Sequence, residues 1–302
     1  MRHRYRPVLW LLALAGVLCP AALRAESGRD DLGMIVELAS PPLRLVSLAP
    51  SNTEILFALG LGSRVVGVTR FCNFPEAAKA LPQVADYSTL SAEAVTGLRP
   101  DLVVAARGND PEGLETLRRT GIPVFALDVQ SVDQLLAAIR RLGDLCGVPD
   151  SSVALEARLS RRIAAVRARV TVLPPTRVLW AYWGEPIFTA GARTMIDDVL
   201  TLAGGDNLGR QASGSWPQIS LETVVAWAPE VIVTSAHQGG PEALAAEVER
   251  LRQTSGWQSV PAVRDGRVCS VDGDLLNRPG PRLVEALEQV AACLHPEPGP
   301  RP

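Results

Sequence analysis

The sequence is short of the residues that most metal sites use. Its 3 histidines, at positions 3, 237 and 295, are too few and too widely separated for a histidine-rich metal site. None of the 5 cysteines forms a Cys-x-x-Cys pair, so a thiolate zinc site is not predicted either. We therefore expect no resident metal.

Motifs for nucleotide binding and hydrolysis are also missing. No Gly-x-Gly-x-x-Gly follows a predicted strand, and there is no phosphate loop with Gly-Lys-Ser or Gly-Lys-Thr. Ser213 and Ser215 lie beside Trp216, but Gly-x-Ser-x-Gly is absent and no histidine with an orienting acid accompanies them. These absences favour a protein that binds without catalysis and needs no cofactor. An unrecognised exported α/β enzyme stays as an alternative.

The chain has little net charge. Its 30 basic and 32 acidic residues leave a formal net charge of -2, so no global field attracts nucleic acid and we expect no such partner. At 302 residues, 47% of them hydrophobic, the chain can build one large or two medium domains.

Residues 1–25 have the order expected of a secretory leader. Basic residues precede the apolar run from Val8 to Leu18, and small residues follow near a cleavage point. This run is shorter than the roughly 20 residues that a membrane span needs, which favours a cleaved leader over an anchor. Cys19 permits lipoprotein anchoring, although Leu18 before it is a poor small residue for that processing.

The central segment 150–172 is predicted to form one long helix. Ser151 or Ser152 can cap its start, and Pro174-Pro175 stops it. At about 1.5 Å per residue, this helix is long enough to cross a small domain. One apolar stripe at helical spacing comprises Leu159, Ile163, Val166 and Val170.

A repeat flanks this central helix. Residues 90–104 align without a gap on residues 219–233: each has a Ser suited to a helix cap, a first-turn Glu, a Pro that ends the helix and an apolar strand. Chance similarity between two ordinary helix-strand units is the alternative. We predict lobes at 43–149 and 176–294, with 295–302 as a loose tail.

Strands and helices alternate in both lobes, which indicates mostly parallel sheets covered on both faces. Ser51 and Glu54 have capping-box spacing at the start of a helix. Glu26 to Pro42 shows no clear periodicity. The predicted fold class is therefore α/β, with two Rossmann-like lobes joined by a single long helix.

Ligands of open α/β sheets bind beyond the carboxyl ends of the strands. The loops at these ends are rich in aromatic residues with polar neighbours, which suits a large, partly flat ligand in a cleft between the lobes. The aromatic residues are Phe71, Tyr87, Tyr182, Trp183, Phe188 and Trp216, and the polar ones are Arg107, Asn109, Asp128, Asp274 and Arg278.

From about Arg44 to Leu294 the chain resembles the periplasmic substrate-binding proteins of ABC importers whose lobes are joined by one helix, the family serving cobalamin, siderophores and haem. The segments that carry the resemblance are 48–54, 98–103, 216–220 and 278–282. The first two are shared across the family, whereas Trp216-Pro217-Gln218 and the 274–278 loop are most similar to members that bind cobalamin. The resemblance implies a periplasmic location, a corrinoid ligand and the membrane subunits of an ABC importer as partner.

The resemblance also implies site residues. Its ligand-binding candidates are Phe71, Tyr87, Trp183, Phe188, Trp216, Asp274 and Arg278. Aromatic rings would cover a flat macrocycle, while Asp and Arg would hydrogen-bond its amide rim. Tryptophans expected after the Val103-Val104 strand, near Ala126 and at Leu275 are missing, so the pocket is expected to be wider or less flat.

One Glu on each lobe docks such proteins on the importer, and Glu112 and Glu242 occupy equivalent places in the repeat. Each also lies at a helix start, where the dipole favours its charge without any partner.

Export makes disulfides possible, and the cysteines of the mature chain allow three pairings. They are Cys72, Cys146, Cys269 and Cys293. Cys293 matches a disulfide cysteine of the similar family member, but Ala203 stands at the partner position, so that bridge is expected to be absent.

The prediction is thus a monomeric, non-enzymatic binding protein that closes only modestly, because its bridge is a rigid helix. Within the same family a siderophore or haem carrier is the alternative, with Tyr87 and Tyr182 as iron ligands. A ligand sensor that signals to a membrane receptor is a further alternative.

Overall fold

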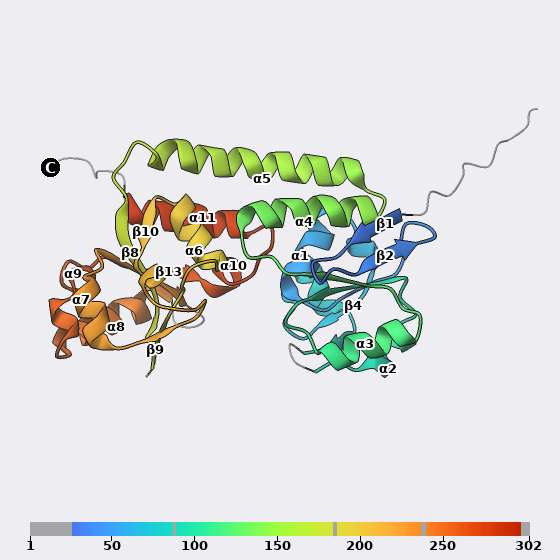
Figure 1. Cartoon of the computed structure of the whole chain (residues 1–302), viewed down its shortest axis with the longest axis horizontal. Coiled ribbons are helices and arrows are strands. Elements are labelled where there is room, and N and C mark those ends of the chain that lie inside the picture. The colour runs from blue at the N-terminus through green and yellow to red at the C-terminus, as the bar shows by residue number, and fades with distance from the viewer. Residues whose placement is uncertain (1–25, 87–88, 184–185, 237–239, 297–302) are drawn as a thin grey trace, which may run out of the picture.

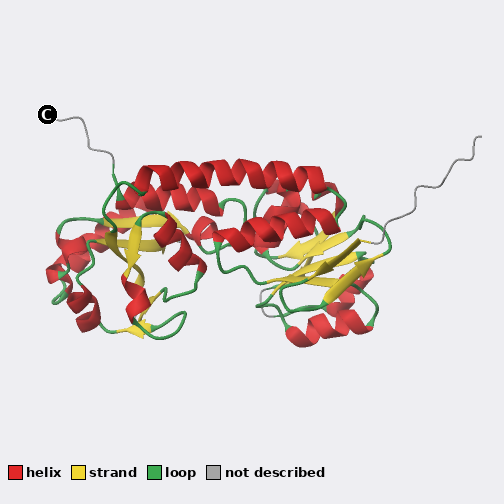
Figure 2. Cartoon of the chain, turned by 45° about the horizontal axis from the view of Figure 1, so that its top comes forward, coloured by secondary structure: helices red, strands yellow, loops and turns green. Residues whose placement is uncertain are grey.

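The computed structural model describes residues 26–86, 89–183, 186–236 and 240–296. Two α/β lobes hang beneath one long helix, α5 (Pro149–Val170), which runs across the top of both (Figure 1). The view in Figure 2 separates the upper layer of helices from the sheets beneath it. This architecture confirms the predicted fold class.

The N-terminal lobe is built on a parallel sheet of five strands in the order β5-β4-β3-β6-β7. Strands β3, β6 and β7 are almost wholly buried, as expected for a parallel sheet with helices on both faces. The strands are β3 (Leu45–Ser47), β4 (Val65–Thr69), β5 (Gln83–Ala85), β6 (Leu102–Ala106) and β7 (Val124–Leu127). The helices are α1 (Pro50–Ala58), α2 (Ala92–Gly97), α3 (Pro111–Arg119) and α4 (Val132–Leu145), with short 3-10 turns η1 (Gly62–Arg64) and η2 (Glu76–Ala80).

The C-terminal lobe has a mixed sheet in the order β11-β9-β8-β12-β13, with β10 beside the start of β8. Strands β8, β10, β12 and β13 pair in parallel, whereas β9 and β11 are antiparallel to their neighbours. The strands are β8 (Thr176–Trp183), β9 (Ile187–Thr189), β10 (Gly205–Asn207), β11 (Gln218–Ile219), β12 (Val231–Ala236) and β13 (Val268–Asp272). The helices are α6 (Met195–Leu202), α7 (Leu221–Trp227), α8 (Gly240–Gln253), α9 (Pro261–Arg264), α10 (Gly273–Leu276) and α11 (Leu283–Leu294), with η3 (Leu208–Gln211) and η4 (Trp257–Ser259).

Helix α5 belongs to both lobes through its packing. The predicted stripe is confirmed, because Leu159, Ile163, Val166 and Val170 are all buried. Its apolar face joins α4 and α11 in one hydrophobic cluster that runs without a break from the N-terminal lobe to the C-terminal lobe. On the far faces of the two sheets, by contrast, each lobe has a cluster of its own.

The helix-strand repeat is present in the structure. The Ser91 side chain accepts a hydrogen bond from the Ala94 N–H, and Ser220 accepts one from the Thr223 N–H, so both predicted caps are confirmed. The residues before the two prolines, Arg99 and Ala228, both have positive φ, at 48° and 45°. Since non-glycine residues rarely adopt this conformation, its recurrence at matching positions supports a repeat over chance similarity.

Two predicted helix caps are wrong. Helix α5 begins at Pro149, the first-turn position that proline favours, and no side chain caps it; Ser152 is buried and donates to the Pro149 carbonyl. Helix α1 begins at Pro50 without a side-chain cap. Glu54 does not close a capping box because its carboxylate binds Arg282, 228 residues away.

The lead-in 26–42 contains structure that the prediction missed. Strands β1 (Glu26–Arg29) and β2 (Ile35–Leu38) form an antiparallel hairpin. The buried Asp30 shapes its turn by accepting from the N–H groups of Leu32 and Met34, and also accepts from the Ala126 N–H of β7. Burial alternates along β2, but the exposed position 35 carries the apolar Ile35, so the alternation is hidden in the sequence.

Cys269 on β13 and Cys293 on α11 form a disulfide, with 6.3 Å between their Cα atoms. Cys293 is therefore bridged, to a partner that the family pattern did not indicate, while Ala203 stands at the position expected of the partner. Cys72 and Cys146 are buried and free. Burial raises the pKa of the Cys146 thiol to about 12, which makes it unreactive.

Candidate functional site

A cavity of about 550 Å³ lies between the lobes, at the carboxyl ends of the parallel strands. The N-terminal lobe contributes loops after β3, β4, β6 and β7, and the C-terminal lobe contributes the starts of α6 and α10 and the loop before β11. Its lining residues are Ala49, Pro50, Ser51, Phe71, Ala106, Arg107, Gly108, Leu127, Asp128, Val129, Gln130, Met195, Trp216, Gly273, Asp274, Asn277, Arg278 and Pro279.

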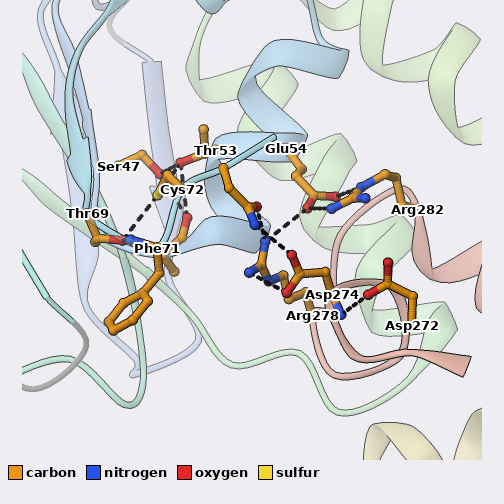
Figure 3. Close-up of polar contacts among 12 residues, drawn as sticks. Ser47, Thr53, Glu54, Thr69, Phe71, Cys72, Asp272, Asp274, Arg278 and Arg282 are labelled. Atoms are coloured by element: carbon orange, nitrogen blue, oxygen red, sulfur yellow. Dashed lines mark hydrogen bonds and ion pairs between the residues drawn. The ribbon is translucent and has the colours of Figure 1, made fainter. Parts of the chain in front are cut away.

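Phe71 is the aromatic wall of the N-terminal lobe. It follows β4, and 41% of it is exposed although it is large and apolar. Its backbone N–H donates to the Thr69 hydroxyl, which is itself bonded to the buried Cys72 thiol, so the loop is held from within (Figure 3). The Arg70 guanidinium lies 4.7 Å from the ring centre. A held, exposed ring is suited to cover a flat ligand.

Trp216 is the aromatic wall of the C-terminal lobe. It is 54% exposed and meets the largely buried Trp180 edge to face, at 5.7 Å between ring centres. Trp180 in turn donates its indole N–H to Ser235 at 3.1 Å, which fixes its orientation. The exposed indole therefore rests on a ring that is itself anchored in the sheet.

Phe188 extends this aromatic surface along the antiparallel strands. Its position on β9 lies opposite Tyr182 on β8 and Gln218 on β11, so these side chains share one face of the sheet. Tyr182 is 55% exposed and Phe188 38% exposed. This face continues past Trp216 beyond the lining of the cavity.

Charged side chains of the C-terminal lobe meet Asn73 of the N-terminal lobe. Arg278 and Asp274 form an ion pair at 2.5 Å. Asn73 accepts from Arg278 at 2.6 Å and donates to Asp274 at 2.7 Å, so the two lobes are joined across the cleft. Figure 3 shows this pair beside Glu54. These contacts fix the positions of Asp274 and Arg278. Their polar atoms therefore lie near the cleft, where a ligand could bond to them.

Glu54 and Arg282 form a second contact between the lobes. The two oxygens of Glu54 accept from Arg282 at 2.6 and 3.0 Å, and Arg278 lies 3.9 Å away. The approach is close because position 280 is glycine: a Cβ there would lie 3.0 Å from the Glu54 carboxylate. Burial raises the pKa of Glu54 even though both arginines oppose the shift.

A third contact joins α4 to α6. Asp198 accepts a hydrogen bond of 2.7 Å from the Val132 N–H, in the first turn of α4, where a helix favours negative charge. Burial raises the pKa of Asp198. The contacts of Glu54, Asn73 and Asp198 join the two lobes directly. The Arg162–Glu288 ion pair adds a link between α5 and α11 of the C-terminal lobe.

Four of the predicted ligand residues, Phe71, Trp216, Asp274 and Arg278, line one cavity. Phe188 lies on the adjoining aromatic face. Trp183 is the last residue of β8, with its side chain outside what the structure describes, and Tyr87 lies outside the described residues as well. The ligand-binding role of all these residues stays a prediction.

Sequence reasoning missed Asn73, Gln130 and Met195. Asn73 has a weak signal, because it stands between Phe71 and Phe74 in a loop after a strand. Met195 is the first residue of α6, and its place in the apolar pattern of that helix suits a core residue as well as a ligand contact. Gln130 is an ordinary loop residue. Only the fold shows that Gln130 and Met195 line the cavity and that Asn73 bonds to Asp274 and Arg278.

Glu112 and Glu242 lie in the first turns of α3 and α8, the equivalent helices of the two lobes, and both are exposed. In the described parts of the chain, no group of three or more His, Cys, Asp or Glu residues could hold a metal ion. Within the same parts, no helix has the length and apolar character that crossing a membrane requires.

Two lobes, a bridging helix and a cleft lined from both sides define a two-lobed binding protein. Residues 45–275 match the family model described as periplasmic binding protein. The chain belongs to this family of periplasmic binding proteins.

Individual relatives agree with this assignment. The vitamin B12-binding protein of Vibrio vulnificus is 31% identical over 259 residues, which cover 85% of this chain and 91% of the relative. The crystal structure of the periplasmic vitamin B12 binding protein of Vibrio cholerae is similar at a TM-score of 0.74, with 31% identity, covering 84% of this chain and 97% of that one. A periplasmic heme-binding protein from Pseudomonas aeruginosa has a TM-score of 0.73 and 32% identity, over 86% and 95% of the two chains.

Proposed function

We propose that the chain captures cobalamin, or a closely related corrinoid, in the cleft between its lobes and delivers it to the membrane subunits of an ABC importer. The observation that carries the proposal is that one cavity has Phe71 from one lobe, Trp216 from the other, and the Asp274–Arg278 pair at its edge. Flat apolar walls with a few fixed polar groups suit a macrocycle with an amide rim. The vitamin B12-binding relatives support this ligand class.

A ferric siderophore or haem is the second candidate ligand. The heme-binding protein from Pseudomonas aeruginosa matches this chain in identity and fold about as well as the vitamin B12 binding protein from Vibrio cholerae does. Tyr182, exposed on the aromatic face, offers a phenolic oxygen to iron.

Calorimetric titration of the mature protein, from Glu26 onward, distinguishes the two candidates. Cyanocobalamin, haem and a ferric siderophore are run in parallel. We expect tight one-to-one binding of cyanocobalamin alone. Heat from haem or the siderophore, with none from cyanocobalamin, would contradict the ligand class and leave the binding-protein fold untouched.

We also propose that Glu112 and Glu242 dock the loaded protein on the importer, from the periplasm. Both carboxylates are exposed and occupy equivalent helix starts, so one partner with approximate two-fold symmetry could engage both. The double variant Glu112→Lys, Glu242→Lys should abolish cobalamin uptake by cells and leave the calorimetric affinity unchanged.

The matched control for docking is Glu115→Lys, Glu249→Lys, which makes the same charge change later on the same two helices. Each of these residues is exposed and forms an ion pair with an arginine one turn away, and Glu249 also accepts a hydrogen bond from the Gln253 side chain. We expect near-normal uptake from the control. Equal loss of uptake in both variants would show a general charge effect and overturn the docking role.

A further inference from the structure

Arg107 and Asp128 form an ion pair on the N-terminal wall of the cleft, at the ends of the neighbouring strands β6 and β7. The Arg107 N–H donates to the Leu127 carbonyl at 2.9 Å, which ties the two strand ends together. The Arg107 side chain is 68% exposed, whereas that of Asp128 is 14% exposed. Both residues line the cavity, the exposed Arg107 guanidinium beside a largely buried carboxylate.

Asp128 is fixed by two neighbours besides Arg107, namely Gln130 and Asp31. Gln130 donates its side-chain amide to the carboxylate at 2.7 Å. The Asp128 backbone N–H donates to the Asp31 carboxylate at 2.8 Å, and Asp31 forms an ion pair with Arg141 at 2.8 Å. The hairpin that precedes the lobe thus holds the pair in place.

The charges of the cavity are balanced. Among the described lining residues the charged ones are Arg107, Asp128, Asp274 and Arg278, and each arginine is paired with an aspartate. Arg70, beside Phe71, is likewise 3.8 Å from Asp86. A ligand group that approaches either arginine therefore also meets a carboxylate.

We propose that the Arg107–Asp128 pair selects ligands whose rim carries uncharged carboxamides over ligands whose rim carries carboxylates. This inference rests on the proposed function. A carboxamide accepts from the free N–H groups of Arg107 and donates its own N–H to Asp128, so it satisfies both partners. A carboxylate gains from Arg107 but is repelled by Asp128, and it has no hydrogen to donate.

The test compares two corrinoids that both lack the nucleotide loop. Cobinamide carries carboxamides on its rim, and cobyrinic acid carries free carboxylates at the same positions. Calorimetry at low ionic strength, where charge effects are least screened, gives both affinities for the wild type and for Asp128→Asn. Thermal melts of each protein establish that the variants are folded.

We expect the wild type to prefer cobinamide by about tenfold or more, as unfavourable charge contacts produce. Asp128→Asn should strengthen cobyrinic acid binding about tenfold and change cobinamide binding less than about threefold. Adding Arg107→Gln should remove that gain. The matched control is Asp144→Asn, the same charge change at an exposed position near the far end of α4, which should alter neither affinity.

Equal affinity of the wild type for the two corrinoids would overturn this inference and leave the proposed function standing. An Asp128→Asn variant without the gain, or an Asp144→Asn variant with the same gain, would also overturn it. A wild type that binds neither corrinoid would also overturn the inference, whereas the proposed function stands or falls on the cyanocobalamin titration.

Discussion

All five strands of the N-terminal lobe's sheet run parallel, whereas the C-terminal lobe adds the antiparallel strands β9 and β11 to a parallel set. Both lobes contain the same helix-strand unit, with β6 and β12 in equivalent places next to the edge strands β7 and β13. The N-terminal lobe meets the cleft with loops that carry Phe71 and a charged pair. The C-terminal lobe meets it with Asp274 and Arg278 around α10 and with Trp216, which precedes β11 and packs on Trp180 of β8. The comparison shows how one repeated unit yields two different walls.

The lobes also differ in their cysteines, and removing the disulfide should have the largest effect on stability. The Cys269–Cys293 bridge closes a segment with a sequence separation of 24 in the C-terminal lobe, while both cysteines of the N-terminal lobe are free. The variant Cys269→Ala, Cys293→Ala should lose about 3 kcal/mol of unfolding free energy, because the unfolded chain regains freedom. Denaturant titration followed by circular dichroism measures this loss.

Reductant provides the control for the disulfide prediction. The wild type should lose stability when reduced, and the double variant should not respond. Coincident denaturation curves for oxidised wild type and variant would show that the C-terminal lobe does not depend on the bridge.

The two aromatic walls should contribute unequally to ligand affinity. Trp216→Ala should weaken cobalamin binding about 100-fold and Phe71→Ala about tenfold, because the indole buries more area and rests on Trp180. Both side chains are exposed, so neither change should unfold the protein. Calorimetry measures the affinities; equal losses would mean that the walls contribute evenly despite their different construction.

The smallest expected effect concerns Glu54, where the lobes meet. Burial raises its pKa in the folded protein, so its contribution to stability is fully present below the unfolded pKa and is lost as the pH rises through the folded pKa. The stability of the wild type relative to Glu54→Gln should therefore fall above about pH 4.5. This relative free energy of unfolding should change by less than about 1.4 kcal/mol per pH unit, which is the limit for the titration of one proton.

Denaturant titrations of both proteins from pH 4 to pH 8 measure this difference. A relative stability that rises with pH would mean that the Arg282 and Arg278 charges outweigh the cost of burial.

Local features of the fold could be predicted from the sequence, and contacts between distant segments could not. The caps Ser91 and Ser220 were correct because each acts within one turn of its own helix. The Ser51–Glu54 spacing wrongly predicted a capping box, because Arg282 of the other lobe binds the Glu54 carboxylate. Strands β9 and β11 have only three and two residues, too few to show alternation.

The candidate site follows the same division. Strand ends correctly placed Phe71, Asp274 and Arg278 at the cleft, since parallel strands align their carboxyl ends. Asn73 could not be found this way, because its importance lies in bonds to residues about 200 positions away. The partner of Cys293 likewise depends on how α11 packs on β13 rather than on a pattern in the chain.

The hydrophobic cluster under α5 has a mechanical consequence. One continuous hydrophobic cluster belongs to both lobes. Moving the lobes apart would therefore break apolar contacts that neither lobe can replace alone. We therefore expect capture of a ligand to need little movement of the lobes, so that little binding energy is spent on deforming the protein. For the same reason, we expect that opening the lobes to release a ligand would need work from outside the protein, supplied by a partner that binds both lobes.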